Sequence, residues 1–496
     1  MNAAPKSYGF LGRENELETL AALWRKRGPS FVACQGRRRI GKSTLLKEFA
    51  RRSGARLLKI EGLAPEPGMT NARQLAEFGR SLAAQTGLPP MSPNNWPEAF
   101  AALDGAIRDT GKTVVLLDEI SWMGGFDKDF PAHLKVAWDN LFHEHRRLVF
   151  VVCGSVSAWI QKNILDNTGF VGRFSLCLTL REMPLRDCLA FWGGAADRIS
   201  ATEAFDLLSV TGGVPRYLEE IDPAETADEN IRSLCFTPAG YLFRDFSQLF
   251  SDVFGKRTKA KREILEVLAE GPASLSDIAR ALGKGRNGHL ADDLAELRLA
   301  GFVSEDAGLN PETGKPVFSP RWRISDPYTR FYLRYIAPRR EAVEHGGFRI
   351  PALSSLPGWD AMKGFQFETL VLGHIDEFLP ALGLSRVNIL SMAPYARKGV
   401  EGVADGPQVA RRVRGCQIDL LIQSDGAIWV VEIKRRKRIG REIEGEVRAK
   451  MAALPIPQGV SVRACLVYLG ELDPAVEESG FFSSIVPVER VLSRLS

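Results

Sequence analysis

The sequence lacks the features that would place it in or across a membrane. It has no uninterrupted apolar run of membrane-spanning length, and its first residues lack the apolar core of a secretory signal. We therefore expect a cytoplasmic protein with no membrane partner. It also contains no internal repeat and no low-complexity tract, so nothing indicates bulk disorder.

Cysteine and histidine are also scarce. The seven cysteines lie at positions 34, 153, 177, 188, 235, 416 and 465, without the paired spacing of a metal site. Most fall in apolar segments, so we expect buried free thiols. His143 and His145 are alternate residues of a predicted helix and do not share a face, which disfavours a metal pair.

What remains is an ordinary globular composition on a long chain. The 496 residues are 45% hydrophobic and 25% charged, and this length predicts three or four domains. The net charge of +5 permits contact with nucleic acid without demonstrating it.

The most informative segment runs from Gly36 to Ser43 and has the spacing G-x-x-x-x-G-K-S. An apolar strand precedes it and a helix follows it, which is the context that a phosphate-binding loop needs. Lys42 would reach the β- and γ-phosphates of ATP, and the Ser43 hydroxyl would bind Mg²⁺. The predicted nucleotide-binding residues of this loop are Gly36, Arg37, Arg38, Arg39, Ile40, Gly41, Lys42, Ser43 and Thr44.

A second apolar run, residues 113–119, ends in two carboxylates. It predicts a buried parallel strand that delivers Asp118 and Glu119 to its carboxyl edge. Asp118 would hold Mg²⁺, and Glu119 would act as the general base toward water.

Further segments up to residue 217 resemble AAA+ and STAND-type ATPases. Arg13 lies in a Gly-Arg-Glu box that stands beside the nucleotide in those proteins, and Ser155 follows an apolar strand where they carry a γ-phosphate sensor. Pro215 and Arg216 resemble their lid element. Arg173 would face nucleotide in its own or a neighbouring subunit, or be ordinary surface charge.

The coarse pattern beyond the loop predicts several modules. Strands alternate with helices from 30 to 180, which indicates a parallel sheet covered on both faces. Three helices and a hairpin near 261–324 predict a winged helix, whose third helix could enter a DNA groove. Asp292, Asp293 and Glu296 on that helix would repel phosphates, which leaves a packing role open. The flanking basic residues that keep DNA contact possible are Lys284, Arg286, Arg321 and Arg323.

A second chemistry is predicted near the C-terminal end. Residues 417–422 and 427–434 flank the turn Asp425-Gly426 and form a hairpin signal. Glu432 and Lys434 would project from one side of their strand, where Asp419 on the partner strand can meet them. The two carboxylates would bind Mg²⁺, and the lysine would stabilise charge on an attacked phosphate or help to orient water.

This arrangement resembles the PD-(D/E)xK restriction-endonuclease-like fold, with Gln-Ile-Asp in place of Pro-Asp. The resemblance implies a further acid from an upstream helix, and Glu368 is the matching residue. The basic run 435–438 would bind a phosphate backbone or form a solvated turn.

Together the segments 12–14, 36–43, 117–119, 212–217 and 326–328 resemble the archaeal-type ATPase family, many of whose members carry a C-terminal nuclease-like domain. We expect an α/β protein with a P-loop core (1–183), a helical lid (184–256), a winged helix (257–337), a connector (338–358) and a nuclease-like domain (359–496).

The leading hypothesis is an ATPase whose nucleotide state controls a Mg²⁺-dependent nuclease acting on nucleic acid, with DNA favoured. By analogy, genome defence suits this plan. The alternative is an ATPase switch with a noncatalytic C-terminal module that binds nucleic acid or docks a protein, and a homo-oligomer is possible.

Overall fold

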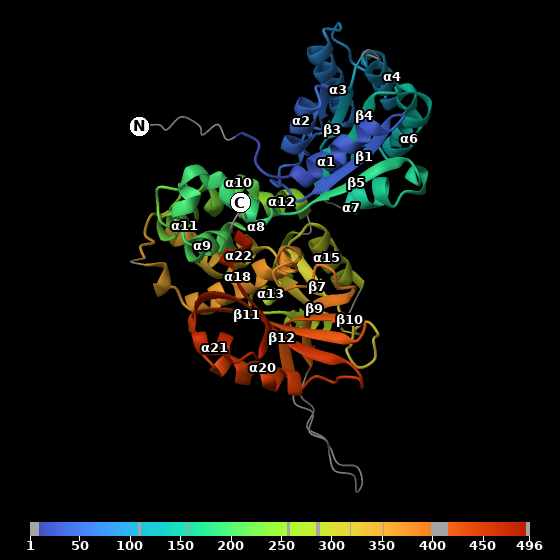
Figure 1. Ribbon diagram of the computed structural model, residues 1–496. Coiled ribbons are helices and arrows are strands. Elements are labelled where there is room, and N and C mark those ends of the chain that lie inside the picture. Colours follow the sequence, from blue (N-terminus) through green and yellow to red (C-terminus); the bar gives the residue numbers. More distant parts are fainter. Residues whose placement is uncertain are drawn as a thin grey trace. The chain divides into compact units, whose positions relative to one another are not determined.

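The computed structural model describes residues 9–107, 111–155, 158–254, 258–283, 288–317, 319–350, 352–397 and 415–492. The chain divides into two compact units (Figure 1). One comprises Met1–Met183 with Val214–Arg216, and the other comprises Pro184–Gly213 with Tyr217–Ser496.

The first unit is built on a five-stranded parallel sheet of order β2-β3-β4-β1-β5. The central strands are apolar on both faces, as parallel strands beneath helices require, and Val114–Leu117 and Val149–Val152 are almost fully buried. The strands are β1 Ser30–Gly36, β2 Arg56–Glu61, β3 Thr113–Asp118, β4 Leu148–Ser155 and β5 Phe174–Leu180. The parallel sheet predicted from the alternating pattern is therefore confirmed.

Helices pack on this sheet, and an aromatic cluster fills one of its faces. Phe31 and Phe150 of the sheet join Trp96 of α4 and Phe130 of α6 in one buried core. Figure 1 shows α3, α4 and α6 gathered along this part of the unit. The helices are α1 Glu14–Ala22, η1 Leu23–Arg25, α2 Lys42–Arg52, α3 Asn71–Thr86, α4 Trp96–Ala106, α5 Ile120–Gly124, α6 Phe130–Asn140, η2 Phe142–Glu144, α7 Ala158–Ile160, η3 Gln161–Leu165 and η4 Thr168–Phe170.

The second unit begins with helices. They are α8 Leu185–Cys188, η5 Leu189–Arg198, α9 Ala201–Thr211, α11 Ala227–Cys235 and α12 Tyr241–Phe254, while α10 Pro215–Leu218 spans the boundary between the units. Side-chain caps define several starts: Ser200 caps α9, and Thr226 with Glu229 forms a capping box on α11.

The three helices and hairpin predicted for 257–337 are present. They are α13 Thr258–Ala269, α14 Leu275–Ala281 and α15 Gly288–Leu299, with strands β7 Val303–Asp306 and β8 Arg321–Ile324, and β6 Ala273–Ser274 completes a sheet of order β6-β8-β7. Phe318, which we expected to open the second wing strand, lies outside the described residues, as do Lys284 and Arg286.

The predicted connector is more structured than expected. Helices α16 Pro327–Phe331, η7 Tyr332–Ile336, η8 Ala337–Arg339, α17 Arg340–Glu344 and η9 Leu353–Ser355 run through or beside it. Val343, Leu353 and Leu356 are buried, so its scattered apolar residues are packed despite the surrounding proline and glycine.

The C-terminal part is a mixed five-stranded sheet of order β13-β12-β11-β10-β9. The predicted hairpin is β10 Cys416–Ser424 paired antiparallel with β11 Ala427–Ile439, and β12 and β13 continue in parallel. The remaining elements are α18 Trp359–Gly373, α19 Ile375–Phe378, β9 Ile389–Arg397, α20 Glu442–Ala452, β12 Ser461–Leu472, α21 Pro474–Glu478, β13 Phe482–Pro487 and α22 Glu489–Leu492. The sequence pattern predicts only the hairpin of this sheet, and strands β9, β12 and β13 were not predicted.

Among the described residues no helix has the length and apolarity needed to cross a bilayer. The expectation of buried thiols holds for Cys34, Cys153, Cys188, Cys235 and Cys465, but it is wrong for the exposed Cys177 and the partly exposed Cys416. His145 Nε2 lies 2.8 Å from Asp104 Oδ1.

Candidate functional site

The phosphate loop joins β1 to α2 and depends on its two glycines. A Cβ atom at Gly36 would lie 2.7 Å from the backbone oxygen of Leu180 on the neighbouring strand, so only glycine fits there. Gly41 has a φ of 88° and immediately precedes α2, a left-handed conformation that favours glycine. The sequence therefore turns sharply and presents the start of a helix, where backbone amides attract an anion.

Lys42 is held inside this loop. Its buried ammonium donates to the carbonyl oxygens of Gly36 and Arg37, each at 3.0 Å. The lysine side chain therefore folds back onto the loop, and its contact with the β- and γ-phosphates stays a prediction. A phosphate oxygen could replace these carbonyls as the acceptor.

Ser43 and Asp118 meet at the carboxyl edge of the sheet. The Ser43 hydroxyl donates to Asp118 Oδ2 at 2.6 Å, and Asp118 is buried at the end of β3. A hydroxyl and a carboxylate are the hard oxygen donors that Mg²⁺ prefers, so this pair fits the ion predicted for it.

Lys59 completes this group and was missed by the sequence reasoning. Its ammonium lies 3.1 Å from Asp118 Oδ2 and 2.5 Å from Glu61 Oε2. Burial lowers the pKa of Lys59, but the two carboxylates outweigh burial and the net shift is upward. A lysine one strand away from the motif gave no signal in the sequence, because only the sheet brings β2 beside β3.

Glu119 follows Asp118 in a left-handed backbone conformation, with φ of 49°. Burial raises its pKa, while nearby Lys42 opposes the shift. Among the described residues its Oε2 is a buried acceptor with no hydrogen-bond partner. A buried carboxylate with a raised pKa and a free oxygen has the properties of a general base.

Ser155 lies at the end of β4, opposite Gly36 in the sheet register. Its backbone N–H interacts with Glu119, and its own hydroxyl is buried without a hydrogen-bond partner in the part of the chain that the structure describes. The structure therefore brings Ser155 to the edge where the motif residues gather. A sensor role for it stays a prediction.

Arg13 contacts the backbone of the phosphate loop. Its buried guanidinium donates to the carbonyl oxygens of Ile40 at 3.2 Å and Arg181 at 2.7 Å, and to Glu16 Oε1 at 3.0 Å. The contact with Ile40 holds the loop backbone, so Arg13 positions the phosphate loop.

Pro215 also lies beside the loop, since its Cγ is 3.8 Å from a Cβ built on Gly41, and Arg216 follows it in α10. Within the loop, the Arg37 guanidinium lies 3.7 Å from Glu182, and Arg38 stacks 5.0 Å from the centre of the Trp122 ring. Arg39 adopts a left-handed conformation, Ile40 is buried, and Thr44 is exposed in the first turn of α2.

Arg173 lies elsewhere. It precedes β5, whose start pairs with Phe31, whereas the loop follows the opposite end of β1. Its guanidinium forms a two-point contact with Asp139, with distances of 2.7 and 2.8 Å. The expectation that Arg173 faces nucleotide in its own subunit is wrong, because entry and exit of a parallel strand lie at opposite edges. A role toward a neighbouring subunit stays a prediction.

The second group of predicted residues gathers on β10 and β11. Asp419 Oδ2 accepts a hydrogen bond from the backbone N–H of Ile433 at 2.9 Å, and Glu432 Oε1 lies 2.7 Å from the Lys434 ammonium. Glu432 is fully buried and Asp419 is 9% exposed. The three side chains therefore share one side of the sheet, as the period of two predicted.

Lys450 joins this acid cluster from α20 and was not predicted. Its ammonium lies 2.6 Å from Glu432 Oε2 and 3.6 Å from Asp419 Oδ1. On the other side, Lys434 lies 3.5 Å from Glu446, which pairs with Arg436 at 3.0 Å. Positive and negative charges thus alternate along the cluster.

Within the acid cluster, Asp419 has a raised pKa. Burial raises its pKa to about 6, and the charge of Glu432 adds to the shift. Two carboxylates with added waters suit Mg²⁺, which needs few protein ligands. The described residues contain no set of three or more histidine, cysteine or acidic side chains arranged to hold a metal, so such a site would rest on Asp419 and Glu432 alone.

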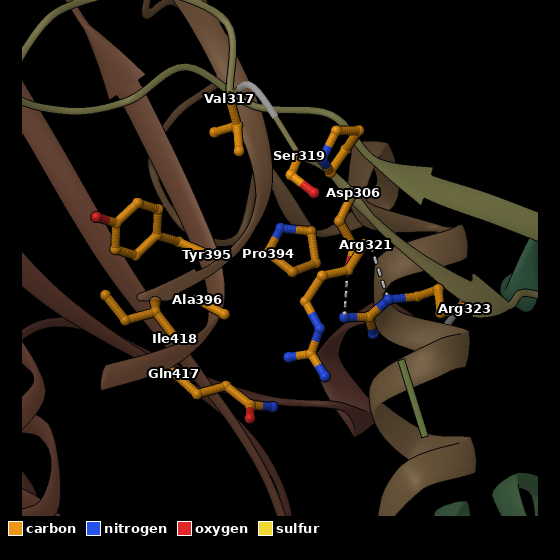
Figure 2. A pocket seen from close by; sticks show the side chains of 11 residues that line it. Asp306, Val317, Ser319, Arg321, Arg323, Pro394, Tyr395, Ala396, Gln417 and Ile418 are labelled. Carbon is orange, nitrogen blue, oxygen red and sulfur yellow. Dashed lines mark hydrogen bonds and ion pairs between the residues drawn. The ribbon is translucent and has the colours of Figure 1, made fainter. Parts of the chain in front are cut away.

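Glu368 lies near Asp419, but its carboxylate is already paired with Arg323. Its carboxylate accepts from Arg323 at 2.7 Å, and the same buried guanidinium binds both oxygens of Asp306 at 2.8 and 3.0 Å. Glu368 is close enough for its charge to raise the pKa of Asp419. Figure 2 shows Arg323 and Asp306 at one side of a small cleft, into which Arg321 points toward Gln417.

The basic run 435–438 does not form a solvated turn, which was one of the two alternatives predicted for it. Strand β11 continues to Ile439, and three of its basic side chains have acidic partners: Arg435 with Asp206, Arg436 with Glu446 and Arg438 with Asp473. Only Lys437 is left as an exposed side chain for which no ion pair is described here. The pairing weakens the case for a phosphate-backbone surface at this run.

Two acids on α15 turn out to point inward. The fully buried Lys261 ammonium lies 3.0 Å from Asp293 and 2.8 Å from Glu296. They are therefore neutralised and would not repel phosphates as we expected, which leaves Asp292 as the exposed acid of the three. Arg323 is equally unavailable for DNA because it is buried against Asp306 and Glu368.

Comparisons with known proteins concern mainly the first part of the chain. Residues 10–221 match the sequence model of a family described as an ATPase domain predominantly from Archaea. An uncharacterized protein of Methanocaldococcus jannaschii is 24% identical over 385 residues, which are 77% of this chain and 79% of that protein.

Two solved structures show a distant likeness. The Walker-type ATPase of Pyrococcus abyssi is 17% identical, with 66% of this chain and 96% of that chain covered and a TM-score of 0.47. The ORC2 protein of Aeropyrum pernix is 17% identical, with 69% and 97% covered and a TM-score of 0.41. The family match ends at residue 221 and does not reach the C-terminal sheet.

Proposed function

We propose that this protein binds and hydrolyses ATP to control a second site in its C-terminal sheet, because residues 10–221 match the sequence model of an ATPase domain predominantly from Archaea. The second site is a Mg²⁺-dependent phosphodiesterase acting on nucleic acid, with DNA favoured. The observation that carries the ATPase half is the 2.6 Å contact between the Ser43 hydroxyl and Asp118, beside the buried Lys42.

Each residue of the nucleotide site has a role that follows from its place. Lys42 binds phosphate oxygens, Ser43 and Asp118 would hold Mg²⁺, and Glu119 takes the proton of the attacking water at its free Oε2. The Mg²⁺ ion supplies positive charge that stabilises the phosphates during transfer. Arg13 keeps the loop in place through Ile40.

Turnover of labelled ATP tests this half. Lys42→Ala should abolish hydrolysis, whereas Lys47→Ala, which removes an exposed lysine from the same helix, should leave it intact. Equal rates for wild type and Lys42→Ala would refute the proposal.

The nuclease half rests on the acid cluster. Asp419 and Glu432 would hold Mg²⁺, and Lys434 stabilises the charge that develops on the attacked phosphate. Support comes from the way β10 and β11 bring these three side chains together on one side of a mixed sheet with α18 and Glu368 nearby. The resemblance to PD-(D/E)xK nucleases gives the reaction class.

Cleavage assays with varied DNA and RNA in Mg²⁺, with and without ATP, test the nuclease. Asp419→Ala should abolish cleavage, and Asp425→Ala, in the exposed turn of the same hairpin, should not. Absence of wild-type cleavage on every substrate form would remove this half and leave the ATPase proposal standing.

A second candidate function keeps the ATPase as a switch and makes the C-terminal sheet a noncatalytic docking module. The alternation of charges in the acid cluster favours it, because each carboxylate already has a cationic partner. Calorimetry that finds no Mg²⁺ or Mn²⁺ site dependent on Glu432 would select this function. Light scattering with and without ATP would test assembly into a homo-oligomer, in which Arg173 would serve a neighbouring subunit.

A further inference from the structure

The acid cluster carries as much positive as negative charge at its centre. Asp419 and Glu432 contribute two carboxylates, and Lys434 and Lys450 contribute two ammonium groups within 3.6 Å of them. Glu446 and Arg436 extend the chain and again cancel each other. A divalent cation that binds these carboxylates must therefore compete with an ammonium group that is already bound to them.

The two lysines do not stand in equivalent positions. Lys434 contacts Glu432 Oε1 and is also held by Glu446, on the outer side of the cluster. Lys450 contacts Glu432 Oε2 and Asp419 Oδ1, and within the described part of the chain it is the one lysine that bridges the two carboxylates. A cation that bound both carboxylates would need the space and charge position that the Lys450 ammonium now holds.

Lys450 is also the group that can move. Its ammonium lies at the end of a flexible four-carbon side chain in the last turn of α20, which ends at Ala452, and the side chain is 21% exposed. Asp419 is fixed by the Ile433 N–H, and Glu432 is fully buried. The carboxylates stay in place while the ammonium can swing toward solvent.

We propose that Lys450 is a built-in counter-ion of the acid cluster, which a divalent cation displaces and which then binds a phosphate of the substrate. This inference rests on the proposed nuclease function and deepens it. An ammonium that loses two carboxylate partners needs a new anion, and a nucleic-acid phosphate provides one. The affinity of the cluster for a divalent cation should therefore be low in the free protein and higher when nucleic acid is bound.

Titration of the full-length protein with Mn²⁺ by calorimetry tests the displacement. Lys450→Met removes the competing charge and should tighten Mn²⁺ binding by about tenfold or more, because a hydrogen-bonded ion pair no longer has to be broken. Arg448→Met is the matched control: it removes a positive charge from the same helix, where Arg448 pairs with Glu444. It should leave the affinity unchanged.

The substitution Asp419→Asn shows which Mn²⁺ ion binds at the acid cluster. Binding of that ion should be lost when Asp419→Asn is introduced into the wild type and into Lys450→Met. Adding a single-stranded oligonucleotide should tighten Mn²⁺ binding to wild type and have little effect on Lys450→Met. Lys450→Arg, which keeps the charge, should behave like wild type.

Two outcomes overturn the proposal in different ways. Equal or weaker Mn²⁺ affinity in Lys450→Met, with an unchanged melting curve, would make Lys450 a structural ion pair and leave the metal site intact. No Asp419-dependent binding in any variant would refute the metal site itself and the displacement with it. Lys450→Gln, which retains a hydrogen-bonding group, replaces Lys450→Met if that variant does not fold.

Discussion

Replacing Arg13 by methionine should weaken ATP binding although the side chain stands behind the phosphate loop. Methionine keeps most of the apolar length of arginine and removes its donors. The carbonyl oxygens of Ile40 and Arg181 then lose the guanidinium that now joins them. The loop would lose the bond that fixes its backbone just before Gly41.

The structure gives the size of the effect. A hydrogen bond from a charged donor contributes about 1.5–3 kcal/mol, and the 3.2 Å contact with Ile40 belongs at the lower end of that range. The pair with Glu16 lies closer to the surface and adds at most about 1 kcal/mol. If the Ile40 contact is what orders the loop, ATP affinity should fall about tenfold, since about 1.4 kcal/mol corresponds to a factor of ten.

Titration of the full-length protein with a fluorescent ATP analogue measures this change, and a thermal melt of the same samples reports stability. Arg25→Met, at an exposed position after α1, is the matched control and should leave both readouts unchanged. A lower melting temperature for Arg13→Met with an ATP affinity within about twofold of wild type would refute the loop-positioning argument.

Three other perturbations follow from the first unit. Gly36→Ala should lower the melting temperature and abolish ATP binding, because the new Cβ lies 2.7 Å from a backbone oxygen of β5; a titration with ATP measures this. Lys59→Met should reduce the Mg²⁺ concentration needed for half-maximal ATPase about three- to tenfold, since its ammonium opposes a cation at Asp118. Arg173 holds the pKa of Asp139 near 2 instead of 3.8, so the stability that this pair contributes is present above pH 3.8 and is lost as the pH falls toward 2. Denaturation midpoints of wild type and Arg173→Met should therefore converge in that window, and a constant difference would contradict the assignment.

Local patterns in the sequence were enough to locate most of the candidate site residues. The loop residues, Asp118 and the hairpin that carries Asp419 and Glu432 are each specified by a few neighbouring residues, and the structure brings them together as the patterns indicated. Glycine at positions 36 and 41 is required by a close approach and by a positive φ, both of which the motif implies.

Residues brought in from other elements could not be found in this way. Lys59 reaches Asp118 only because β2 pairs with β3, and Lys450 reaches Glu432 only because α20 crosses the sheet after β11. A lysine on an amphipathic helix or at a strand end usually faces water, so nothing local distinguishes these two.

The errors have the same origin. The entrance of β5 resembles a functional position in sequence, but parallel pairing places Arg173 at the edge away from the loop. The acids of α15 looked like a repelling surface until Lys261, on a different helix, proved to neutralise two of them.

The ion pair between Arg323 and Glu368 has a practical consequence for anyone who wishes to study the last domain separately. Cutting the chain between η8 and α18 would remove the Arg323 guanidinium that pairs with Glu368. It would also remove the carbonyl oxygens of Ser209 and Pro327, to which Gln366 donates hydrogen bonds. A fragment that starts near Trp359 would therefore leave the side chains of Gln366 and Glu368 without these hydrogen-bond partners, and it should precipitate or unfold. A fragment that begins at Pro184 keeps these partners and is the sensible unit to express.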